Sequence, residues 1–441
     1  MGGVEVGILS IIVIVALIYA GVYIPVALGL VSFVGVWIIR EDIDMPISLL
    51  AQATADAVSD QVFATIPLFA LMGLVVSEAG LGKDVYQVAN VIFRRVRGGL
   101  GIATVAANAV FAAITGSSIA SASVFTRISV PEMRRYDYTK RFAVGVVAGS
   151  SVLGMLIPPS AMLIVYAIVT EQSVGHMFLA GIIPGLILSV AYIVLIVVLA
   201  RMTPGFVGGS TGAPAAEPDE PVEGPLLIWV ALKLLPVVAL VVVVLGGIYG
   251  GVGTAVEAGA AGSAVAILIA LMKRSLTWAR FWAVLTETGY ITAAILFLII
   301  TASMYSRMLG VAALPTLFGE WMQGLQMGFV AVMVLYVIML IFLGTILDTT
   351  SIILIIVPLF LPMAEELGMH LVWFGIITVV GAEIGLLTPP LGISCFAIKS
   401  TLSDPTISLA DIFIGAFPFA VTMLLVLILL IAYPVLSLAL L

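Results

Sequence analysis

Long apolar stretches, separated by short polar segments, recur along the whole chain. Residues 6–22, 226–245 and 412–433 are three of them. A membrane-spanning α-helix needs about 20 mostly apolar residues, and these stretches are close to that length. Their apolar positions do not alternate with the two-residue period of a barrel strand. The pattern therefore predicts an all-α polytopic membrane protein.

Two short segments in this pattern repeat each other. Residues 154–159 read Gly-Met-Leu-Ile-Pro-Pro and residues 385–390 read Gly-Leu-Leu-Thr-Pro-Pro, at an offset of 231 positions (385 − 154). Pro131 and Pro362 share this offset. A proline pair removes two backbone donors and clashes with the preceding turn, so it breaks a helix. The sequence thus predicts two similar halves, each with one broken helix.

The first half also contains a candidate hairpin. Its apolar residues 98–130 lie between two basic clusters, which the positive-inside rule places on the cytoplasmic side. Both ends should therefore face the cytoplasm, with the small polar residues Gly116, Ser117 and Ser118 at the turn. We predict a re-entrant helical hairpin, because each arm is short for a full crossing. Two ordinary spans joined by a tight loop are the alternative.

The basic residues form three clusters, all predicted to be cytoplasmic. They are Arg94, Arg95 and Arg97, then Arg134, Arg135, Lys140 and Arg141, and then Lys273, Arg274 and Arg280. In the second half the equivalent hairpin turns near Gly344, and its flanks carry only acidic charges, such as Glu320 and Glu365. This hairpin should therefore open to the periplasm. Two similar halves of opposite orientation are typical of an inverted-repeat secondary transporter with its site near the membrane midplane.

The predicted organisation has three parts. The first inverted repeat covers residues 1–202, with a hairpin at about 98–133 and a broken helix at about 142–170. The second covers residues 226–441, with a hairpin at about 328–364 and a broken helix at about 371–400. Between them, residues 203–225 are rich in Gly, Pro, Ala and acidic residues and form a flexible linker.

The remaining segments fit the inversion if the N-terminus is periplasmic. An acidic amphipathic segment at residues 41–58 precedes a span at 61–79. A basic amphipathic segment at residues 273–287 precedes a span at 288–307. We expect the two amphipathic segments to lie on opposite faces of the membrane.

Composition narrows the classes of function. The chain has 63% hydrophobic and 9% charged residues, so its main environment is a lipid bilayer and we expect no nucleic-acid partner. One cysteine, Cys395, and two histidines, His176 and His370, cannot supply a disulfide framework or a His/Cys zinc site. The sequence has no His-Glu-x-x-His motif and no nucleophile with a plausible base. We therefore expect neither an enzyme nor a cofactor.

Hydroxyl groups and freed carbonyls near the helix breaks predict two cation sites. Hard oxygen ligands of this kind suit Na⁺ in broken-helix transporters. The first site would use Ser117, Ser118, Ser150 and the carbonyls around Gly154 and Pro158, and the second Thr345, Asp348, Thr349, Thr388 and the carbonyls near Gly385. The alternative is that these residues only allow close helix packing.

Ionisable residues inside apolar spans are candidates for function. Asp348 lies in the second turn itself. Glu383 lies two residues before Gly385, where it would tune the second cation site or pair with a neighbour. Arg127, in the returning arm of the first hairpin, would either hold a solute carboxylate or belong to a buried ion pair. We predict Arg127, Ser160 and Glu383 as solute-binding residues.

These motifs together resemble the large membrane (M) subunit of the tripartite ATP-independent periplasmic (TRAP) transporters. The resemblance covers nearly the whole chain. Its most specific stretches are residues 116–118 (Gly-Ser-Ser), 130–133 (Val-Pro-Glu-Met), 154–160, 171–173 (Glu-Gln-Ser) and 383–392, from Glu383 to Gly392.

The resemblance implies an elevator-type fold in the bacterial inner membrane. It also implies Na⁺-driven import of a carboxylate solute, with Na⁺ as the coupling ion. A periplasmic substrate-binding protein would deliver the solute, and a small four-helix membrane subunit, here expected as a separate polypeptide, would complete the transporter. Three alternatives remain: a stand-alone sodium/dicarboxylate symporter, a channel and a membrane enzyme. Neither the solute, the number of Na⁺ ions per cycle nor the oligomeric state follows from the sequence.

Overall fold

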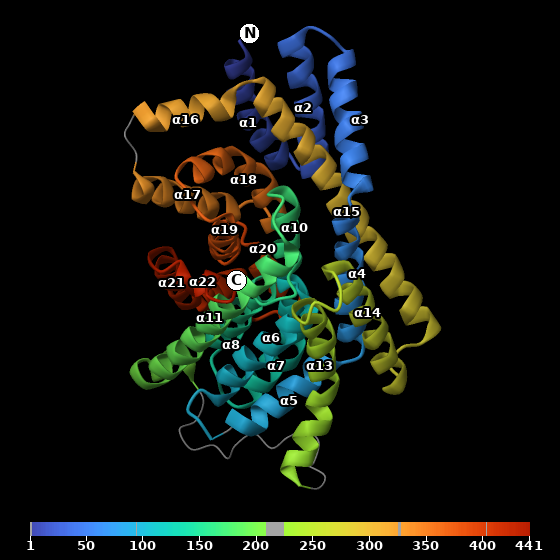
Figure 1. Cartoon of the computed structure of the whole chain (residues 1–441). Helices are drawn as coiled ribbons and strands as arrows, with labels where there is room; N and C mark the ends of the chain where they lie inside the picture. Colours follow the sequence, from blue (N-terminus) through green and yellow to red (C-terminus); the bar gives the residue numbers. More distant parts are fainter. Residues whose placement is uncertain (1, 94, 209–224, 325–327, 403) are drawn as a thin grey trace.

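Helices form the regular secondary structure of the chain, as the apolar pattern predicts. The computed structural model describes residues 2–93, 95–208, 225–324, 328–402 and 404–441 (Figure 1). Within these ranges seven helices are long and apolar enough to cross a membrane, or eight if the bent pair Lys140–Leu156 and Ala161–Val169 forms one span. The prediction of an all-α polytopic membrane protein is confirmed. Arg94 and most of the predicted linker, residues 209–224, lie outside the described residues.

The first half contains helices up to α12. They are α1 (Gly3–Tyr19), α2 (Ile24–Arg40), α3 (Asp44–Ser59), the 3₁₀ turn η1 (Gln61–Ala64), α4 (Thr65–Glu78), α5 (Leu81–Phe93), α6 (Gly99–Thr115), α7 (Ser118–Arg135), α8 (Lys140–Ser151), α9 (Leu153–Leu156), α10 (Ala161–Val169), α11 (Val174–Met202) and α12 (Pro204–Val207).

The second half contains the remaining helices. They are α13 (Leu226–Tyr249), α14 (Ala255–Met272), α15 (Trp278–Val311), α16 (Leu314–Gly324), α17 (Phe329–Gly344), α18 (Thr349–Glu366), α19 (Leu371–Leu386), α20 (Ile393–Thr401), α21 (Leu409–Ala432) and α22 (Val435–Leu438).

The helices group into two bodies (Figure 1). A frame consists of α1–α4 and α13–α15, in which α15 packs on α2, α3 and α4, and α14 packs on α4. A hairpin body consists of α6–α11 and α17–α22, in which α8 packs on α21 and α19 packs on α17. Two helices join the bodies. Helix α5 connects α4 of the frame to α6 of the hairpin body, and α16, at the top of Figure 1, connects α15 of the frame to α17 of the hairpin body.

The frame differs between the two halves. The predicted amphipathic segment 273–287 and span 288–307 lie in one continuous helix, α15, of 34 residues. No proline interrupts it. In the first half, by contrast, Asp60 caps η1 by accepting a hydrogen bond from the Val62 amide at 2.9 Å, and Pro67 lies in the first turn of α4. The cap and the proline explain why this stretch is divided into three helical pieces.

Broken helices form the centre of the hairpin body. Residues Phe142–Ser151 of α8 and Val372–Leu386 of α19 are all buried. A helix that is apolar on every side must be enclosed by other helices. Cys395, on α20, is also fully buried. The helices that precede the two proline pairs are therefore enclosed by other helices along most of their length.

The helices α8 and α21 cross at two glycines. A Cβ atom on Gly415 would overlap the carbonyl oxygen of Arg141, and one on Gly145 would overlap the carbonyl of Gly415. Beside the crossing, the buried carboxylate of Asp411 binds Lys140 Nζ at 2.7 Å and Arg141 Nε at 3.0 Å. Small residues let membrane helices approach this closely. Backbone contact and a charged network thus hold the first-half helix α8 to the second-half helix α21.

Candidate functional site

The turn of the first hairpin rests against the break of the first broken helix. Helix α6 ends at Thr115 and α7 begins at Ser118, so the turn is Gly116 and Ser117. The Ala161 amide, just after the break, donates a hydrogen bond to the Gly116 carbonyl at 3.3 Å. A Cβ atom on Gly154 would lie 2.8 Å from the Ser117 carbonyl carbon and oxygen. Glycine at position 154 therefore allows the turn to approach the broken helix.

The second half repeats this arrangement. A Cβ atom on Gly344 would lie 2.9 Å from Gly385 Cα, so the hairpin helix α17 meets the broken helix α19 at two glycines. The Leu391 amide, just after the second Pro-Pro pair, donates to the Thr345 carbonyl at 3.1 Å. In each half, a carbonyl of the hairpin turn thus accepts a hydrogen bond from the chain beyond the break.

Residues of both turns, of the first break and of the helix ends that flank the second break line one cavity of about 460 Å³. Frame helices α4 and α15 close its other side, with Phe69 and Ile295 among the lining residues. Most of the lining is apolar. Glu287 and Asp348 are the acidic residues that line it, and its described lining contains no lysine or arginine.

Four helices begin at this cavity. They are α7, α10, α18 and α20, and residues of each one's first turn line it. Side chains cap three of these ends: Ser117 accepts from the Ala120 amide at 3.3 Å, Ser160 from Leu163 at 3.4 Å, and Asp348 from Ser351 at 3.2 Å. A helix N-terminus carries a partial positive charge and favours an anion. An anion here would meet helix ends and hydroxyl groups instead of a basic side chain.

The first set of predicted cation ligands lies near the first turn. Ser150 is fully buried, and its hydroxyl donates to the Val146 carbonyl at 2.7 Å. Ser118 is also fully buried, and its hydroxyl has no hydrogen-bond partner within the described residues. Ser117 and Gly154 meet at the turn, whereas Pro158 lies in the break that follows.

Sequence reasoning missed Asn108 of α6. Its side chain is fully buried, and its Nδ2 donates to Ser150 Oγ at 2.6 Å. Its Oδ1 has no partner within the described residues. A buried polar atom without a partner is unfavourable unless a ligand or water satisfies it. Asn108 and Ser118 therefore offer two unsatisfied oxygens on the two arms of the first hairpin.

The second set of predicted ligands is more fully bonded. Thr345 Oγ1 donates to the Phe342 carbonyl and Thr388 Oγ1 to the Ile384 carbonyl, both at 2.8 Å. The carboxylate of Asp348 accepts from the amide and the hydroxyl of Ser351. Asp348 and Thr349 also line the cavity, and Gly385 lies against the turn. Within the described residues no group of three or more His, Cys, Asp or Glu could hold a metal ion, so a cation would need hydroxyl, amide and carbonyl oxygens beside any single carboxylate.

The three predicted solute-binding residues do not line this cavity. Arg127 is exposed on α7, five residues beyond the buried Ala122. Ser160 is fully buried, and its hydroxyl already donates to the Met155 carbonyl. Glu383 is fully buried behind Thr349, whose Oγ1 donates to Glu383 Oε1 at 2.8 Å. None of the three is among the described residues that line the cavity.

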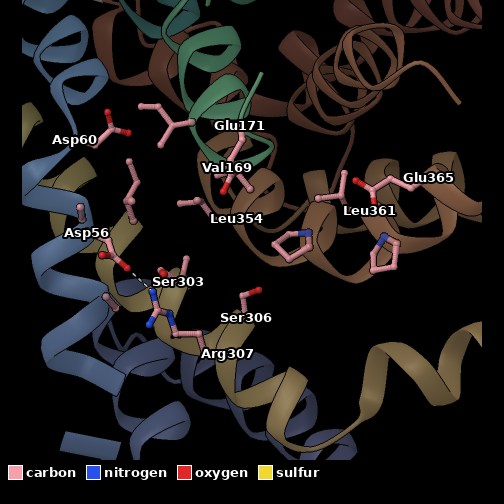
Figure 2. Close-up of a pocket in the computed structure, with 17 residues that line it drawn as sticks. Asp56, Asp60, Val169, Glu171, Ser303, Ser306, Arg307, Leu354, Leu361 and Glu365 are labelled. Carbon is pink, nitrogen blue, oxygen red and sulfur yellow. Dashed lines mark hydrogen bonds and ion pairs between the residues drawn. The ribbon is translucent and has the colours of Figure 1, made fainter. Parts of the chain in front are cut away.

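A second cavity, of about 470 Å³, opens between α3 and α15 on one side and α10 and α18 on the other. Figure 2 shows the Arg307 side chain turned toward Asp56, and its guanidinium binds that carboxylate at 2.5 Å. Asp60, Glu171 and Glu365 also line this cavity. Four carboxylates around one already paired arginine would repel an anion and attract cations.

Comparison with known proteins gives a match over most of the chain. The family model described as "Tripartite ATP-independent periplasmic transporter, DctM component" matches residues 11–436. The "C4-dicarboxylate TRAP transporter large permease protein DctM" of Pseudomonas aeruginosa is 34% identical over 378 residues, which are 85% of this chain and 85% of the relative. The "Sialic acid TRAP transporter large permease protein SiaM" of Vibrio cholerae is 27% identical, over 95% of this chain and 94% of the relative.

The fold is also similar to that of a solved transporter. The structure of the Alcanivorax borkumensis YdaH transporter, described as having an unusual topology, superposes with a TM-score of 0.63 at 15% sequence identity. The match covers 89% of this chain and 88% of the other. At this identity the likeness concerns the arrangement of the helices.

Proposed function

Because the chain belongs to the DctM component family of tripartite ATP-independent periplasmic (TRAP) transporters, we propose that it imports an organic acid in symport with Na⁺. Its family makes it a transporter component and not an enzyme. The observation that carries the proposal is the cavity of about 460 Å³, which is lined by both hairpin turns, the first helix break and the helix ends beside the second. A site between two repeats and at broken helices is typical of secondary transporters.

The geometry supports an anionic solute in this cavity. Four helix N-termini face it, and their partial positive charges favour a carboxylate without a basic side chain. Two relatives are named for C4-dicarboxylate and for sialic acid, which are both organic acids. We therefore place the solute carboxylate at the helix N-termini and its carbon skeleton against the apolar lining.

The unsatisfied oxygens support Na⁺ as the coupling ion. In the first site, Asn108 Oδ1 and Ser118 Oγ are buried without partners in the described residues, and hard oxygen ligands of this kind suit a small alkali cation. In the second site, Asp348 lines the cavity, and its carboxylate supplies hard oxygen ligands of the same kind. Bound Na⁺ would also reduce repulsion between Asp348 and an anionic solute.

The division into two bodies supports an elevator mechanism in the bacterial inner membrane. The hairpin body would carry solute and Na⁺ past the frame, while α5 and α16 would transmit its movement. In this proposal the two hairpins are re-entrant and open to opposite faces, and the N-terminus is periplasmic. A small four-helix membrane subunit and a periplasmic substrate-binding protein complete the transporter.

Uptake into proteoliposomes tests the proposal. The chain is reconstituted with its small subunit, and radiolabelled organic acids are added with or without a Na⁺ gradient and the binding protein. We expect uptake only when the gradient, the small subunit and the binding protein are all present. Uptake by the chain alone would instead favour a stand-alone symporter, and uptake without a Na⁺ gradient would contradict Na⁺ coupling.

Replacing Asn108 with alanine is expected to weaken the response of the protein to Na⁺. A ligand that binds only the folded state raises its stability, and a tenfold loss of affinity lowers this gain by about 1.4 kcal/mol at high ligand concentration. We expect Na⁺, compared with K⁺, to raise the melting temperature of the parent chain more than that of the Asn108→Ala variant. The measurement is thermal unfolding in detergent at matched ionic strength.

Thr104 provides the control for this experiment. It lies one turn earlier on α6, is fully buried, and donates only to the Leu100 carbonyl at 2.8 Å. The Thr104→Ala variant should lose stability equally in both salts and keep the parent response to Na⁺. An equal Na⁺ response in the Asn108→Ala and Thr104→Ala variants would remove Asn108 from the cation site.

A further inference from the structure

Arg127 is an exposed charge near the midpoint of the hairpin helix α7. Its side chain has no hydrogen bond and no ion pair within the described residues. The other basic residues of this helix, Arg134 and Arg135, lie in its last turn, and α6 has no lysine or arginine. Arg127 is therefore the only basic residue in the interior of the first hairpin.

One face of α7 carries both the lining of the solute cavity and Arg127. Ala120 and Ser123 line the cavity. Arg127 follows Ser123 by four residues, which places it on the same side of the helix and about 6 Å further along it. Another side of the helix is buried, where Phe125 packs on Phe111 of α6 with ring centroids 5.6 Å apart. Arg127 thus extends the cavity face of α7 by one turn.

This face runs from the solute cavity toward the basic end of the hairpin. The last turn of α7 contains Arg134, for which the charge pattern predicts a cytoplasmic position. The frame helix α15 shows the same order of residues on the other side of the cavity. Its residues Ile295 and Glu287 line the cavity, and Arg280 lies beyond Glu287 in its first turn. Arg127 therefore lies between the cavity and the predicted cytoplasmic end.

A lipid environment does not suit Arg127. An arginine in the hydrocarbon core is strongly unfavourable, and such residues face a water-filled space or pair with another group. Arg127 has no such partner within the described residues, and the same side of α7 lines the solute cavity one turn earlier. Water that continues from the cavity along this face explains both observations.

The charges along this face favour an anion on the hairpin side. The described cavity lining contains no lysine or arginine, so Arg127 is the first basic residue beyond Ser123 on α7. Glu287 lines the cavity from the frame. An anionic solute is repelled by Glu287 and attracted by the Arg127 guanidinium, which can bind a carboxylate through two hydrogen bonds. Because Arg127 is exposed, water screens this attraction and lets the solute leave again.

We propose that Arg127 is an anion-binding residue on a water-filled path between the solute cavity and the cytoplasm. A solute carboxylate that leaves the helix N-termini meets this guanidinium first and then passes to the cytoplasmic surface. The proposal rests on the transport function proposed above. It adds a second, weaker binding position for the same solute, outside the cavity.

Chemical modification of arginine tests the path without any transport. The parent chain is reconstituted with its small subunit and treated with p-hydroxyphenylglyoxal, a water-soluble arginine reagent, and the modified residues are mapped by mass spectrometry. We expect modification of Arg127 as well as of Arg134, which is exposed near the end of the same helix. Modification of Arg134 without Arg127 would overturn the proposal, because Arg127 would then face lipid or the small subunit.

Uptake by charge variants tests the role of the guanidinium. In the proteoliposome assay above, with an organic acid that the parent transports, uptake rates should fall in the order parent, Arg127→Lys, Arg127→Gln, Arg127→Glu. At about 0.1 M salt we expect Arg127→Gln to lose about fivefold, the effect of one unit charge at about 4 Å in water. Added KCl should bring the parent rate closer to that of Arg127→Gln, because salt screens exposed charges.

Arg134 provides the matched control on the same helix. It lies about 16 Å beyond Ser123 along α7, more than the screening length of about 10 Å at 0.1 M salt, so Arg134→Gln should stay near the parent rate. Equal losses in Arg127→Gln and Arg134→Gln would overturn the proposal. A loss in the Arg127 variants that follows neither the charge order nor the salt concentration would overturn it too, because Arg127 would then have a structural role. A parent without Na⁺-driven uptake would contradict the proposed transport function, whereas an unmodified Arg127 would contradict the path, so the two failures are distinguishable.

Discussion

Changing Gly415 to alanine is expected to unfold the hairpin body or leave very little of it folded. The new methyl group would overlap the Arg141 carbonyl on α8, and a backbone cannot turn aside as a side chain can. Overpacking usually costs about 1–3 kcal/mol, and here the helices must also separate, so we expect a loss of about 3 kcal/mol or more. Separation would weaken the bonds of Asp411 to Lys140 and Arg141. The measurement is thermal unfolding in detergent, together with the yield of monodisperse protein.

A glycine on the frame gives the matched control. Gly310 lies in α15, and a Cβ atom there would meet nothing within 4 Å. Because glycine in a helix is less stable than alanine by about 0.5–1 kcal/mol, Gly310→Ala should be neutral or slightly stabilising. If Gly415→Ala unfolds at the same temperature as Gly310→Ala, the close crossing of α8 and α21 does not exist in the protein.

Removing the carboxylate of Asp348 is expected to cause the largest loss of transport among single changes in the cavity. Its charge is the strongest attraction for a cation in the proposed second site. Asp348 also caps α18, and losing an N-cap costs about 1 kcal/mol. Asp348→Ala removes both the charge and the cap, whereas Asp348→Asn removes the charge and keeps a capping oxygen. We expect both variants to lose at least about tenfold in Na⁺-driven uptake, the equivalent of about 1.4 kcal/mol.

The comparison of these two variants separates charge from capping. Recovery of uptake in Asp348→Asn would show that only the cap matters and would remove Asp348 from the cation site. Asp60→Ala is the control, because Asp60 caps η1 in the same way but lies in the other cavity. It should lose little uptake. Rates measured over a range of Na⁺ concentrations complete the test, because a cation ligand should raise the Na⁺ concentration needed for half-maximal uptake.

The breaks in the chain could be predicted from the sequence because their causes are local. A proline pair cannot donate backbone hydrogen bonds, and it interrupts a helix wherever it lies in one. The structure accordingly ends α9 at Leu156 and α19 at Leu386, just before the two pairs. Small polar residues likewise marked the turn at Gly116, where φ is +61°. The two-body arrangement required the structure, because α5 and α16 carry no comparable signal.

The contacts that build the site could not be predicted in the same way. Asn108 and Ser150 are 42 residues apart, and no pattern in the sequence links Asn108 to the predicted ligand Ser150. Gly415 is one of 43 glycines, and only the three-dimensional crossing with α8 shows that this one touches a backbone. Arg127 attracted attention as a charge in an apolar span, yet it lies exposed on α7, outside the cavity lining. A charge pattern along the chain does not tell which side of a helix faces a cavity.

The burial of Cys395 has a practical value for labelling chemistry. It is the one cysteine in the sequence and is fully buried, so a water-soluble maleimide should find little to react with in the folded parent chain. Thiols introduced one at a time near Gly98 and Gly328, where the first arms of the two hairpins begin, would therefore react without interference from Cys395. The side of the membrane from which each one reacts would decide whether the two hairpins open to opposite faces.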